Sequence, residues 1–322
     1  MLDFRFFNPI KKELKIVERS LIDNIDTDIS LLDNASTHLI KAGGKRLRPA
    51  FTLLAAKIYA DSLEKVIPVA VALELIHMAS LVHDDVIDNS NVRRGAETVK
   101  SKWGNRVSIY AGDYILAKSL SLVAGYKRSD MVDVLAEASM RICEGEIIQM
   151  LSCFNVDQGF KDYLRRIERK TALLISVSCK LGGMVSDAPQ KEIQALTKYG
   201  YYLGMAFQVT DDILDFTADE KTLGKPVGSD IRQGVITLPA LYALKNDSNR
   251  DELSRLLSSP ELCISEADRI IEIVINSNGI DYAYDVTRRY AQKARQQLSL
   301  LPAVPVTKTL YDMTDFVLNR KF

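Results

Sequence analysis

Helical periodicity runs through this 322-residue chain and limits its fold more than any other feature of the sequence. In LTKYGYYLGMAFQVTDDILDF, residues 196–216, large apolar side chains recur at three- or four-residue intervals, beginning with Leu196, Tyr199, Leu203 and Phe207. A repeat of about 3.6 residues predicts a helix with one buried face. The sustained alternation of polar and apolar residues that would predict strands is absent from the sequence. We therefore expect an all-α fold.

Short polar connectors divide the chain into about ten or more predicted helices. Glycine, proline, asparagine and aspartate gather at residues 43–44, 89–95, 125–130, 155–159, 182–189, 219–234, 246–251, 276–279 and 302–305. None of these connectors is a Gly/Ser-rich or Pro-rich linker long enough to separate two domains. We therefore predict one all-helical domain that spans residues 1–322.

Composition and charge exclude several classes of protein. Hydrophobic residues make up 47% of the chain and charged residues 26%, as in ordinary globular proteins, so disorder is excluded. Forty-two basic residues balance forty-two acidic ones, so no overall field attracts nucleic acid or an anionic membrane. The four cysteines lack CxxC spacing, which argues against structural zinc and for reduced thiols.

Neither a signal peptide nor a transmembrane helix is expected. The first residues, MLDFRFFNPIKKELK, mix charges into their apolar residues too early for a signal-peptide core. The longest apolar run, at 66–82, contains Pro68, Glu74 and His77. It falls short of the roughly 20 apolar residues that a spanning helix needs. Together with the cysteines, these features predict a cytoplasmic protein.

The pattern Asp-Asp-x-x-Asp occurs twice, as DDVID at 84–88 and DDILD at 211–215. On a helix, the first and last aspartates of each copy share a face. Such a like-charged pair destabilises an exposed helix by about 0.2–0.5 kcal/mol, and a bound cation would reverse that effect. Carboxylates without cysteine or histidine ligands suit Mg²⁺, which commonly bridges carboxylates to phosphates. One copy could be a solvated helix end, but two copies, each after an apolar helical segment, predict a metal site.

Basic residues near these motifs could bind the phosphates that such a metal site implies. The segment AGGKRLRP at 42–49 places Lys45, Arg46 and Arg48 after two glycines, but it lacks the Ser or Thr that a P-loop requires. His77 precedes the first motif by two helical turns, and we assign it to substrate binding rather than to metal, because a lone histidine more often donates a hydrogen bond.

We expect different roles for two further basic clusters. Arg93 and Arg94 directly follow the first aspartate motif, where they could contact a phosphate. In RRIERKTALL, we expect Arg165 and Arg166 on a solvated helix face. For the Lys170–Thr171 pair in the same segment, a structural role and a binding role remain equally open.

Taken together, these motifs resemble those of the trans (E)-polyprenyl diphosphate synthases along nearly the whole chain. The matching segments, in the order and spacing of that family, are GGKRLRP, ELIHMASLVHDDVIDNSNVRRG, GDYIL, EGE at 144–146, RKTA, FQVTDDILDF and LGKPVGSDIRQGVITLP. Within the family, the chain is similar to the larger, catalytic components (component II) of bacterial heptaprenyl diphosphate synthases. One departure is Gly234, where farnesyl synthases of this family carry another lysine. The resemblance implies an isoprenoid-synthase fold, a helical bundle around a central substrate cavity.

The resemblance also implies a reaction and a cofactor. Mg²⁺ draws the diphosphate from an allylic prenyl diphosphate, and the double bond of isopentenyl diphosphate attacks the resulting allyl cation. Loss of a proton then completes each extension. About three Mg²⁺ ions are implied when diphosphate is bound. The product would serve as a quinone side chain.

Matching position by position, the resemblance gives each candidate residue a role. The implied Mg²⁺ ligands are Asp84, Asp88 and Asp211. The residues that would support them are Asp85, Asp212 and Asp215. The allylic diphosphate would be held by Arg93, Lys170 and Lys225. Isopentenyl diphosphate would be held by Lys45, Arg48, His77 and Arg94. Thr171 and Gln208 would line the reacting carbons, and helical spacing independently places Gln208 on one stripe with the second aspartate motif.

Product length is predicted from Ala79 and Ser80, which lie about one helical turn before Asp84. In the family a bulky aromatic residue at this level closes the pocket after a short product. Two small residues one helical turn before the metal therefore imply an open tunnel and a product of about thirty to forty carbons. Within that range, the resemblance to heptaprenyl diphosphate synthases favours heptaprenyl diphosphate. The alternative is that both residues simply ease helix packing.

Three other functions stay open as alternatives: a synthase of short products, a terpene cyclase, and a non-catalytic subunit of a prenyl synthase. A cyclase binds no second diphosphate, so Lys45, Arg48 and Arg94 would lack a purpose. A non-catalytic subunit usually loses metal ligands, and both motifs are intact here. The implied partners are isopentenyl diphosphate, an allylic prenyl diphosphate, and either a second copy or a small regulatory subunit. Peripheral membrane contact during product release is also implied.

Overall fold

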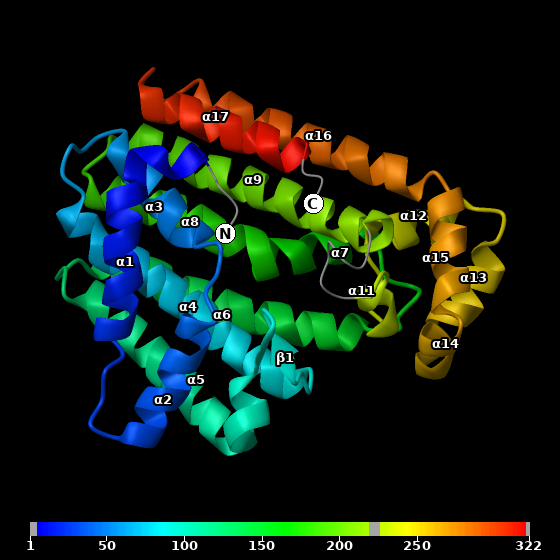
Figure 1. Ribbon diagram of the computed structural model, residues 1–322. Helices are drawn as coiled ribbons and strands as arrows, with labels where there is room; N and C mark the ends of the chain where they lie inside the picture. The colour runs from blue at the N-terminus through cyan, green and yellow to red at the C-terminus, as the bar shows by residue number, and fades with distance from the viewer. Residues whose placement is uncertain (1–4, 219–225, 320–322) are drawn as a thin grey trace. The chain divides into compact units, whose positions relative to one another are not determined.

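Figure 1 shows the computed structural model of the protein, which describes residues 5–218 and 226–319. Most of these residues are helical, and the two strands have two residues each, so the prediction of an all-α fold is confirmed. The connectors predicted at 43–44 and 155–159 lie between helices, whereas those predicted at 125–130 and 182–189 overlap the start of α6 (Ser129–Ser152) and the end of α8 (Leu173–Val185). All four cysteines are free thiols, as their spacing predicted.

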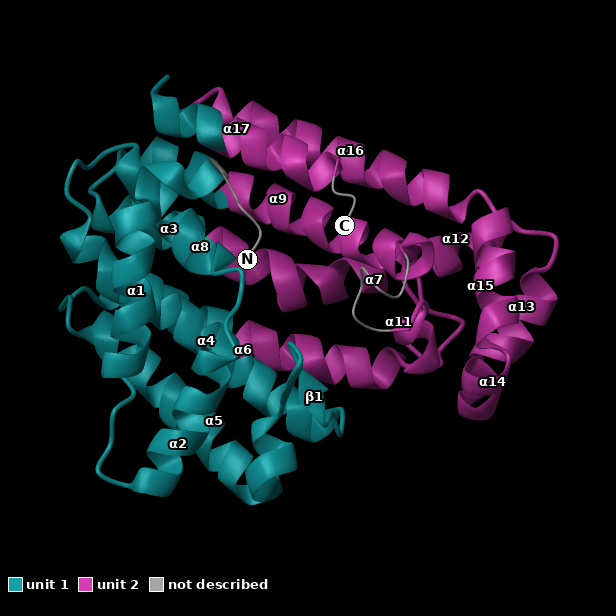
Figure 2. Cartoon of the chain, in the orientation of Figure 1, with its two compact units in different colours: residues 1–139, 177–197, 301–309 teal, residues 140–176, 198–300, 310–322 magenta. Residues whose placement is uncertain are grey.

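The chain divides into two compact units, which are coloured separately in Figure 2. Unit 1 comprises residues 1–139, 177–197 and 301–309, and unit 2 comprises residues 140–176, 198–300 and 310–322. The helices that contain residues of both units are α6 (Ser129–Ser152), α8 (Leu173–Val185), α9 (Gln190–Thr217) and α17 (Pro305–Leu318). The single domain over residues 1–322 stays a prediction.

Unit 1 is built around helix α4. Its elements are η1 (Arg5–Ile10), α1 (Lys11–Asp23), α2 (Ser30–Lys41), α3 (Leu47–Lys57), η2 (Glu64–Val66), α4 (Ile67–Ile87), β1 (Val92–Arg93), β2 (Ala96–Glu97) and α5 (Val99–Ala124). Pro68 lies in the first turn of α4, where its missing N–H costs no hydrogen bond. Most side chains of α4 are buried, and the helix packs against α5, α3 and α1. This burial explains the long apolar run in the sequence.

The same region is the one candidate for a membrane span among the described residues. Residues Glu64–Ile87 are long and apolar enough to cross a bilayer, but 72% of the most apolar window is buried inside the protein. The apolar character of this segment is accounted for by its place in the core of unit 1.

A short hairpin follows α4, and the sequence did not predict it. Strands β1 and β2 pair antiparallel, with Arg93 opposite Ala96. Arg94 and Gly95 form the turn with φ angles of 55° and 76°. Two consecutive positive φ angles are typical of the tight hairpin turn whose twist matches the strands. The hairpin leads into α5, where the Thr98 side chain accepts a hydrogen bond from the Ser101 N–H at 3.0 Å and caps the helix.

Unit 2 has its own core. Its elements are α7 (Phe160–Ile167), η3 (Glu168–Ala172), α11 (Ser229–Arg232), α12 (Leu238–Asn246), α13 (Arg250–Leu257), α14 (Pro260–Ser265), α15 (Ala267–Asn276) and α16 (Gly279–Leu298), with the adjoining parts of the shared helices. Apolar residues of α7, α9 and α12 to α16 form one buried cluster that includes Tyr163, Val209 and Leu241. Element η3 is a π-helix, a form that is rare and often occurs at functional sites.

Candidate active site

The exposed side of α4 places the first aspartate motif in unit 1. His77, Ser80 and Asp84 are half-buried on a helix that is otherwise mostly buried, and Asp88 at its end is exposed. Their spacing of three and four residues puts them in one row on a helix. The carboxylates of Asp84 and Asp88 can therefore meet a ligand from the same side.

The middle aspartate of this motif has a different environment. Asp85 is buried and accepts a hydrogen bond from Arg93 Nε at 2.7 Å, which makes a charged pair. Burial raises the pKa of Asp85, while the Arg93 guanidinium opposes that change. The backbone carbonyl of Asp85 also accepts from the Ser90 N–H at 2.9 Å. Asp85 thus fixes the hairpin to the end of α4, and Arg93 contacts the motif directly.

Unit 1 has a basic region made of four arginines whose charges all act on His77: Arg46, Arg48, Arg93 and Arg94. Arg46, which the sequence did not assign to the site, binds both oxygens of Glu18 at 2.7 Å and Oε1 of Glu74 at 3.1 Å. Glu74 is buried, and its other oxygen has no hydrogen-bond partner in the described residues. Arg46 therefore has a structural role at the start of α3, where its φ of 49° is left-handed.

Two residues predicted to bind isopentenyl diphosphate lie in this basic region. Burial lowers the pKa of Arg48 to about 10, and its Nε has no hydrogen-bond partner in the described residues. Arg94 donates to the carbonyl oxygen of Gly43, in the loop that precedes Lys45. An unpaired guanidinium N–H that is shielded from water is a ready donor for an anionic oxygen.

The same arginines act on His77. Burial lowers its pKa well below the usual value, and the charges of Arg48, Arg94, Arg93 and Arg46 lower it further. The imidazole is therefore neutral near pH 7. A neutral imidazole can donate one hydrogen bond and accept another, which fits the predicted contact with substrate.

The second aspartate motif lies in unit 2 and is held by neutral donors. Asp212 is buried, and it accepts from the Tyr163 hydroxyl at 2.6 Å and from Gln208 Nε2 at 2.8 Å. The Gln208 amide oxygen in turn accepts from the Thr171 hydroxyl at 2.6 Å. Burial raises the pKa of Asp212 to about 7, and the charge of Asp230 adds to this rise.

Close packing between α9 and η3 makes this chain of hydrogen bonds possible. A Cβ atom at Gly204 would lie only 2.5 Å from Cα of Ala172, so any larger residue would push the two helices apart. Thr171 and Gln208 are thereby brought within hydrogen-bond distance. The sequence placed both residues at the site, and the structure brings them together with Asp212.

The outer aspartates of the second motif differ from each other. Asp211 is half-buried. Asp215 is buried and accepts from the Ser229 hydroxyl at 2.9 Å and from the Asp230 N–H at 3.1 Å. Its own backbone carbonyl accepts from the Gly228 N–H at 2.8 Å. Asp215 therefore anchors the start of α11, and its role as a support for the metal ligands stays a prediction.

Lys170 lies on the π-helix η3. Its Nζ lies 3.0 Å from Oε1 of Gln149 and 3.4 Å from Oε2 of Glu146, both on α6. The neighbouring Arg169 pairs with Glu144 at 2.6 Å. The EGE segment thus orients two consecutive basic residues of η3. Lys225, the other lysine predicted to hold the allylic diphosphate, lies outside the described residues.

One expectation from the sequence was wrong. Arg166 is only 3% exposed, whereas Arg165 is exposed as predicted. The Arg166 guanidinium donates to the carbonyl oxygen of Ile236 at 2.8 Å and lies over the ring of Tyr163, 5.5 Å from its centroid. The run of charges predicted a solvated helix face, but the helix turns Arg166 inward, where it satisfies a buried backbone carbonyl.

Two other findings were not available from the sequence. Tyr163 holds Asp212, yet nothing in the segment around it marks a tyrosine as part of the site. Gly234 has a φ of 76°, and a Cβ atom there would lie 2.5 Å from the ring of Phe154. The glycine found in place of the lysine of farnesyl synthases is therefore required by the local backbone in this protein.

Ala79 and Ser80, the two residues predicted to set product length, are both in unit 1. Ala79 is 2% exposed, and Ser80 is half-buried with its hydroxyl donating to the His77 carbonyl at 2.9 Å. Of the two, Ser80 lies in the row of His77 and Asp84. The role of this pair in product length stays a prediction.

The carboxylates suit a hard cation that brings other ligands with it. Within residues 5–218 and 226–319, no three Asp, Glu, His or Cys side chains gather closely enough to hold an ion by themselves. Of the predicted ligands, Asp84 and Asp211 are half-buried and Asp88 is exposed. Mg²⁺ fits such donors, because it usually keeps waters and binds one or two carboxylates together with phosphates.

Comparison with known proteins agrees with these features. The polyprenyl synthetase family model matches residues 29–274. Component 2 of heptaprenyl diphosphate synthase from Bacillus subtilis is 44% identical over 97% of this chain and 89% of its own length. The heptaprenyl diphosphate synthase structure from Staphylococcus aureus is 39% identical, with a TM-score of 0.90 over 96% of this chain and 98% of that one.

A further solved structure bears on ligands. The polyprenyl synthase from Caulobacter crescentus CB15, solved with calcium and isoprenyl diphosphate, is 34% identical, with a TM-score of 0.92 over 98% of this chain and 97% of that one. The resemblance noted in the sequence is thus confirmed by full-length matches in both sequence and structure. This chain belongs to the polyprenyl synthetase family and is a prenyltransferase.

Proposed function

We propose that this protein is an all-trans polyprenyl diphosphate synthase of medium or long chain length, which adds isopentenyl diphosphate units to an allylic prenyl diphosphate. The observation that carries the proposal is that both aspartate motifs are complete and alike in design. In each, a first aspartate that is half-buried, Asp84 or Asp211, precedes a buried middle aspartate held by hydrogen bonds. Relatives that make heptaprenyl and nonaprenyl diphosphates support the product class.

The metal would be held by Asp84, Asp88 and Asp211, with Asp85, Asp212 and Asp215 fixing the backbone around them. When bound, Mg²⁺ supplies Lewis-acid assistance to the departure of diphosphate. Arg93, Lys170 and Lys225 would neutralise the allylic diphosphate. Thr171 and Gln208, already ordered by their mutual hydrogen bond, would present polar atoms to the developing allyl cation.

The second diphosphate would bind in the basic region of unit 1. Lys45, Arg48 and Arg94 supply positive charge, and neutral His77 supplies a hydrogen bond. The unpaired Nε of Arg48 supports this assignment, because a buried donor without a partner costs free energy that an anion would recover. A cyclase would have no use for this second cluster.

Apolar residues on α6 support association with a partner. Met140, Ile147, Met150 and Leu151 are all exposed, Leu151 by 77%. Their spacing gives one apolar stripe along the helix. We propose that this stripe contacts a second copy or a small regulatory subunit. The relatives named component 2 favour an assembly of more than one chain.

The enzyme would act in the cytoplasm, contact the membrane only peripherally when it releases product, and supply quinone side chains.

One assay tests the function. The purified chain is incubated with farnesyl diphosphate, labelled isopentenyl diphosphate and Mg²⁺, and the products are sized; a matched reaction contains EDTA. We expect labelled products of about thirty to forty carbons that require the metal, given the small residues one turn before Asp84. A product formed from the allylic substrate alone would indicate a cyclase. No turnover, even with a candidate small subunit added, would indicate a non-catalytic subunit.

Product length is tested at the tunnel residues. Ser80→Phe should shorten the main product to about fifteen or twenty carbons, because the ring would lie one helical turn before Asp84 and obstruct only the growing tail. The first condensation should stay fast. Ala79→Phe is the companion variant, and its burial predicts a greater loss of stability. Folded, active Ser80→Phe enzyme that makes the parent's longest product would rule out a tunnel along this row.

A further inference from the structure

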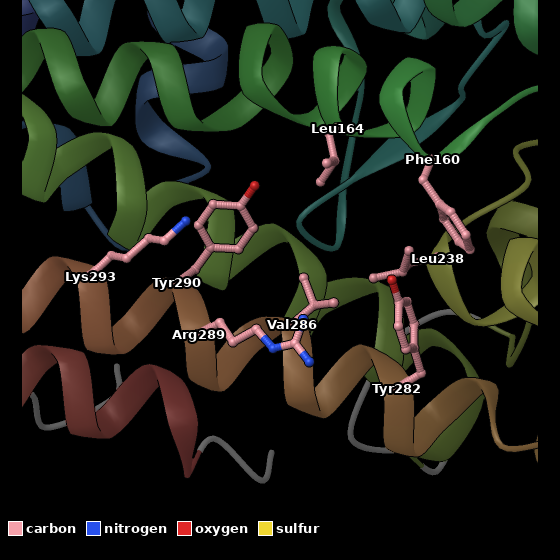
Figure 3. Close-up of a pocket in the computed structure, with 8 residues that line it drawn as sticks. All are labelled: Phe160, Leu164, Leu238, Tyr282, Val286, Arg289, Tyr290 and Lys293. Atoms are coloured by element: carbon pink, nitrogen blue, oxygen red, sulfur yellow. The ribbon is translucent and has the colours of Figure 1, made fainter.

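A pocket in unit 2 lies apart from the residues assigned to the reaction. It has a volume of about 210 Å³ and lies between α7, the start of α12 and α16. Figure 3 shows Phe160 and Leu164 projecting from α7 on one side, with Tyr282, Arg289 and Lys293 on α16 on the other. None of the predicted catalytic or substrate-binding residues lines it.

The walls of this pocket are aromatic and held in place. Tyr282 stacks on Tyr242 with ring centroids 4.7 Å apart and lies 5.6 Å from Phe160. Lys245 Nζ lies over the Phe160 ring, 4.6 Å from its centroid. Rings that contact one another in this way keep their positions when the pocket is empty, and they offer flat faces to a flat ligand.

The rim of the pocket carries positive charge. Arg289 is exposed and has no carboxylate partner among the described residues, whereas the adjacent Arg288 pairs with Asp285. Lys293 Nζ lies 5.5 Å from the ring centroid of Tyr290 and 5.7 Å from that of Tyr202. Aromatic faces thus hold the lysine at the pocket edge, and its charge remains available to an anion.

We propose that this pocket binds a small aromatic carboxylate, with its ring against Phe160 and Tyr282 and its anionic group beside Arg289 and Lys293. Apolar walls with a few convergent polar groups are typical of ligand sites. The volume lies below the roughly 300–1,000 Å³ of pockets for drug-sized ligands, which favours a compact one- or two-ring acid over a long chain.

Helix α7 connects the pocket to the second aspartate motif. Phe160 and Leu164 line the pocket, while Tyr163 on the same short helix donates to Asp212. Leu238 also lines the pocket, two residues beyond the Ile236 carbonyl that binds Arg166. A ligand that fixes α7 would therefore alter the free energy of ordering Asp212 and α9. This site would act as a regulatory site on the proposed synthase activity.

Binding can be tested without turnover. Calorimetric titration of the purified chain with 1-naphthoate should show one site, and neutral 1-naphthalenemethanol should bind at least tenfold more weakly. Arg289→Gln and Lys293→Gln should each weaken naphthoate about five- to tenfold, as expected for the loss of a charge-assisted contact at a partly exposed rim. Arg288→Gln is the matched control and should leave both affinities unchanged, because its charge is already paired.

Two further measurements decide where the ligand binds. Val286→Trp should fill the pocket and abolish binding of both compounds, while inorganic diphosphate with Mg²⁺ should not displace naphthoate. Equal affinity for the acid and the alcohol, equal effects of the Arg288 and Arg289 variants, or displacement by diphosphate would each overturn the site. These results are independent of whether the enzyme makes long products.

The regulatory coupling has a separate readout. Saturating naphthoate should change the apparent affinity for allylic diphosphate by about fivefold or more, the lower end of typical coupling between sites. The same addition should have no effect on Val286→Trp, whose side chain fills the pocket. Calorimetric binding without any kinetic change would support the site and overturn the coupling.

Discussion

The two aspartate motifs have the same five-residue pattern but are supported by different chemistry. In the first, the buried middle aspartate, Asp85, is paired with the positive charge of Arg93. In the second, Asp212 is held by the neutral side chains of Tyr163 and Gln208. A pattern of carboxylates therefore does not by itself say how each carboxylate is held.

The difference has a physical consequence for each motif. A charged partner favours the ionised carboxylate and opposes the effect of burial, as Arg93 does for Asp85. Neutral donors stabilise the ionised form less, so burial raises the pKa of Asp212 to about 7. The first motif is thus built in a field of positive charge, and the second in a network of oriented hydrogen bonds.

The largest expected effect is the loss of turnover when the first aspartate of either motif is replaced. Asp84→Ala and Asp211→Ala should each lower turnover by about a thousandfold or more, because we propose that these carboxylates bind the metal. Both variants should remain folded, since neither side chain is part of the core. The check is steady-state turnover together with thermal unfolding of each purified variant. Near-normal turnover in either one would contradict its assignment as a metal ligand.

The next effect is a loss of stability when the charged partner of Asp85 is removed. Arg93→Ala would leave Asp85 buried without its partner, which should reduce the free energy of unfolding by about 2–3 kcal/mol. Arg94→Ala, at the neighbouring position, is the control. It removes an exposed side chain that contacts a backbone carbonyl, so the loss should be under about 1 kcal/mol. Denaturant unfolding measures both, and equal losses would show that the Asp85 pair has no special weight.

Removing a neutral donor to Asp212 should lower the free energy of unfolding by still less. Tyr163→Phe removes the hydroxyl that Asp212 accepts from, at nearly constant volume, so the free energy of unfolding should fall by about 1–2 kcal/mol. Affinity for Mg²⁺ and the allylic substrate should weaken, because Asp211 lies next to the loosened carboxylate. The measurement is the Mg²⁺ dependence of turnover at fixed substrate. Full retention of that dependence would show that Gln208 alone holds Asp212.

Local features of the sequence predicted much of the fold and the candidate site. Helical periodicity, glycine-rich breaks and the two aspartate motifs depend on residues close together in the chain, so they could be read directly. The tertiary partners could not. Tyr163 and Asp212 lie 49 residues apart, and Arg46 and Glu74 lie 28 apart. Whether such residues meet depends on how helices pack, which no local pattern records.

Arg166 shows that a local pattern can also predict the wrong environment for a residue. Its position in a run of charges predicted solvation, but the carbonyl of Ile236, 70 residues away, needed a donor. The π-helix η3 was equally hidden, because no composition marks the insertion of one residue into a helical turn. Sequence reasoning proposed the residues of the candidate site, and it missed partners such as Tyr163 that hold them.

The smallest expected effect concerns pH and the positive field of unit 1. Burial and four nearby arginines keep the pKa of His77 well below its usual value of 6.5 in the folded protein. In the unfolded chain the imidazole titrates near that usual value. As pH falls below about 6.5, the unfolded state binds a proton that the folded state does not, so stability must decline. One such proton gives a slope of at most about 1.4 kcal/mol per pH unit.

His77→Gln should therefore flatten the fall in unfolding free energy between about pH 6.5 and 5.5, whatever its effect at pH 7. Inorganic diphosphate should also flatten the wild-type curve, because an anion among the arginines would offset their charge and raise the pKa of His77. Parallel stability curves for the two proteins across this range would show that His77 does not feel the positive field that distinguishes the first motif from the second.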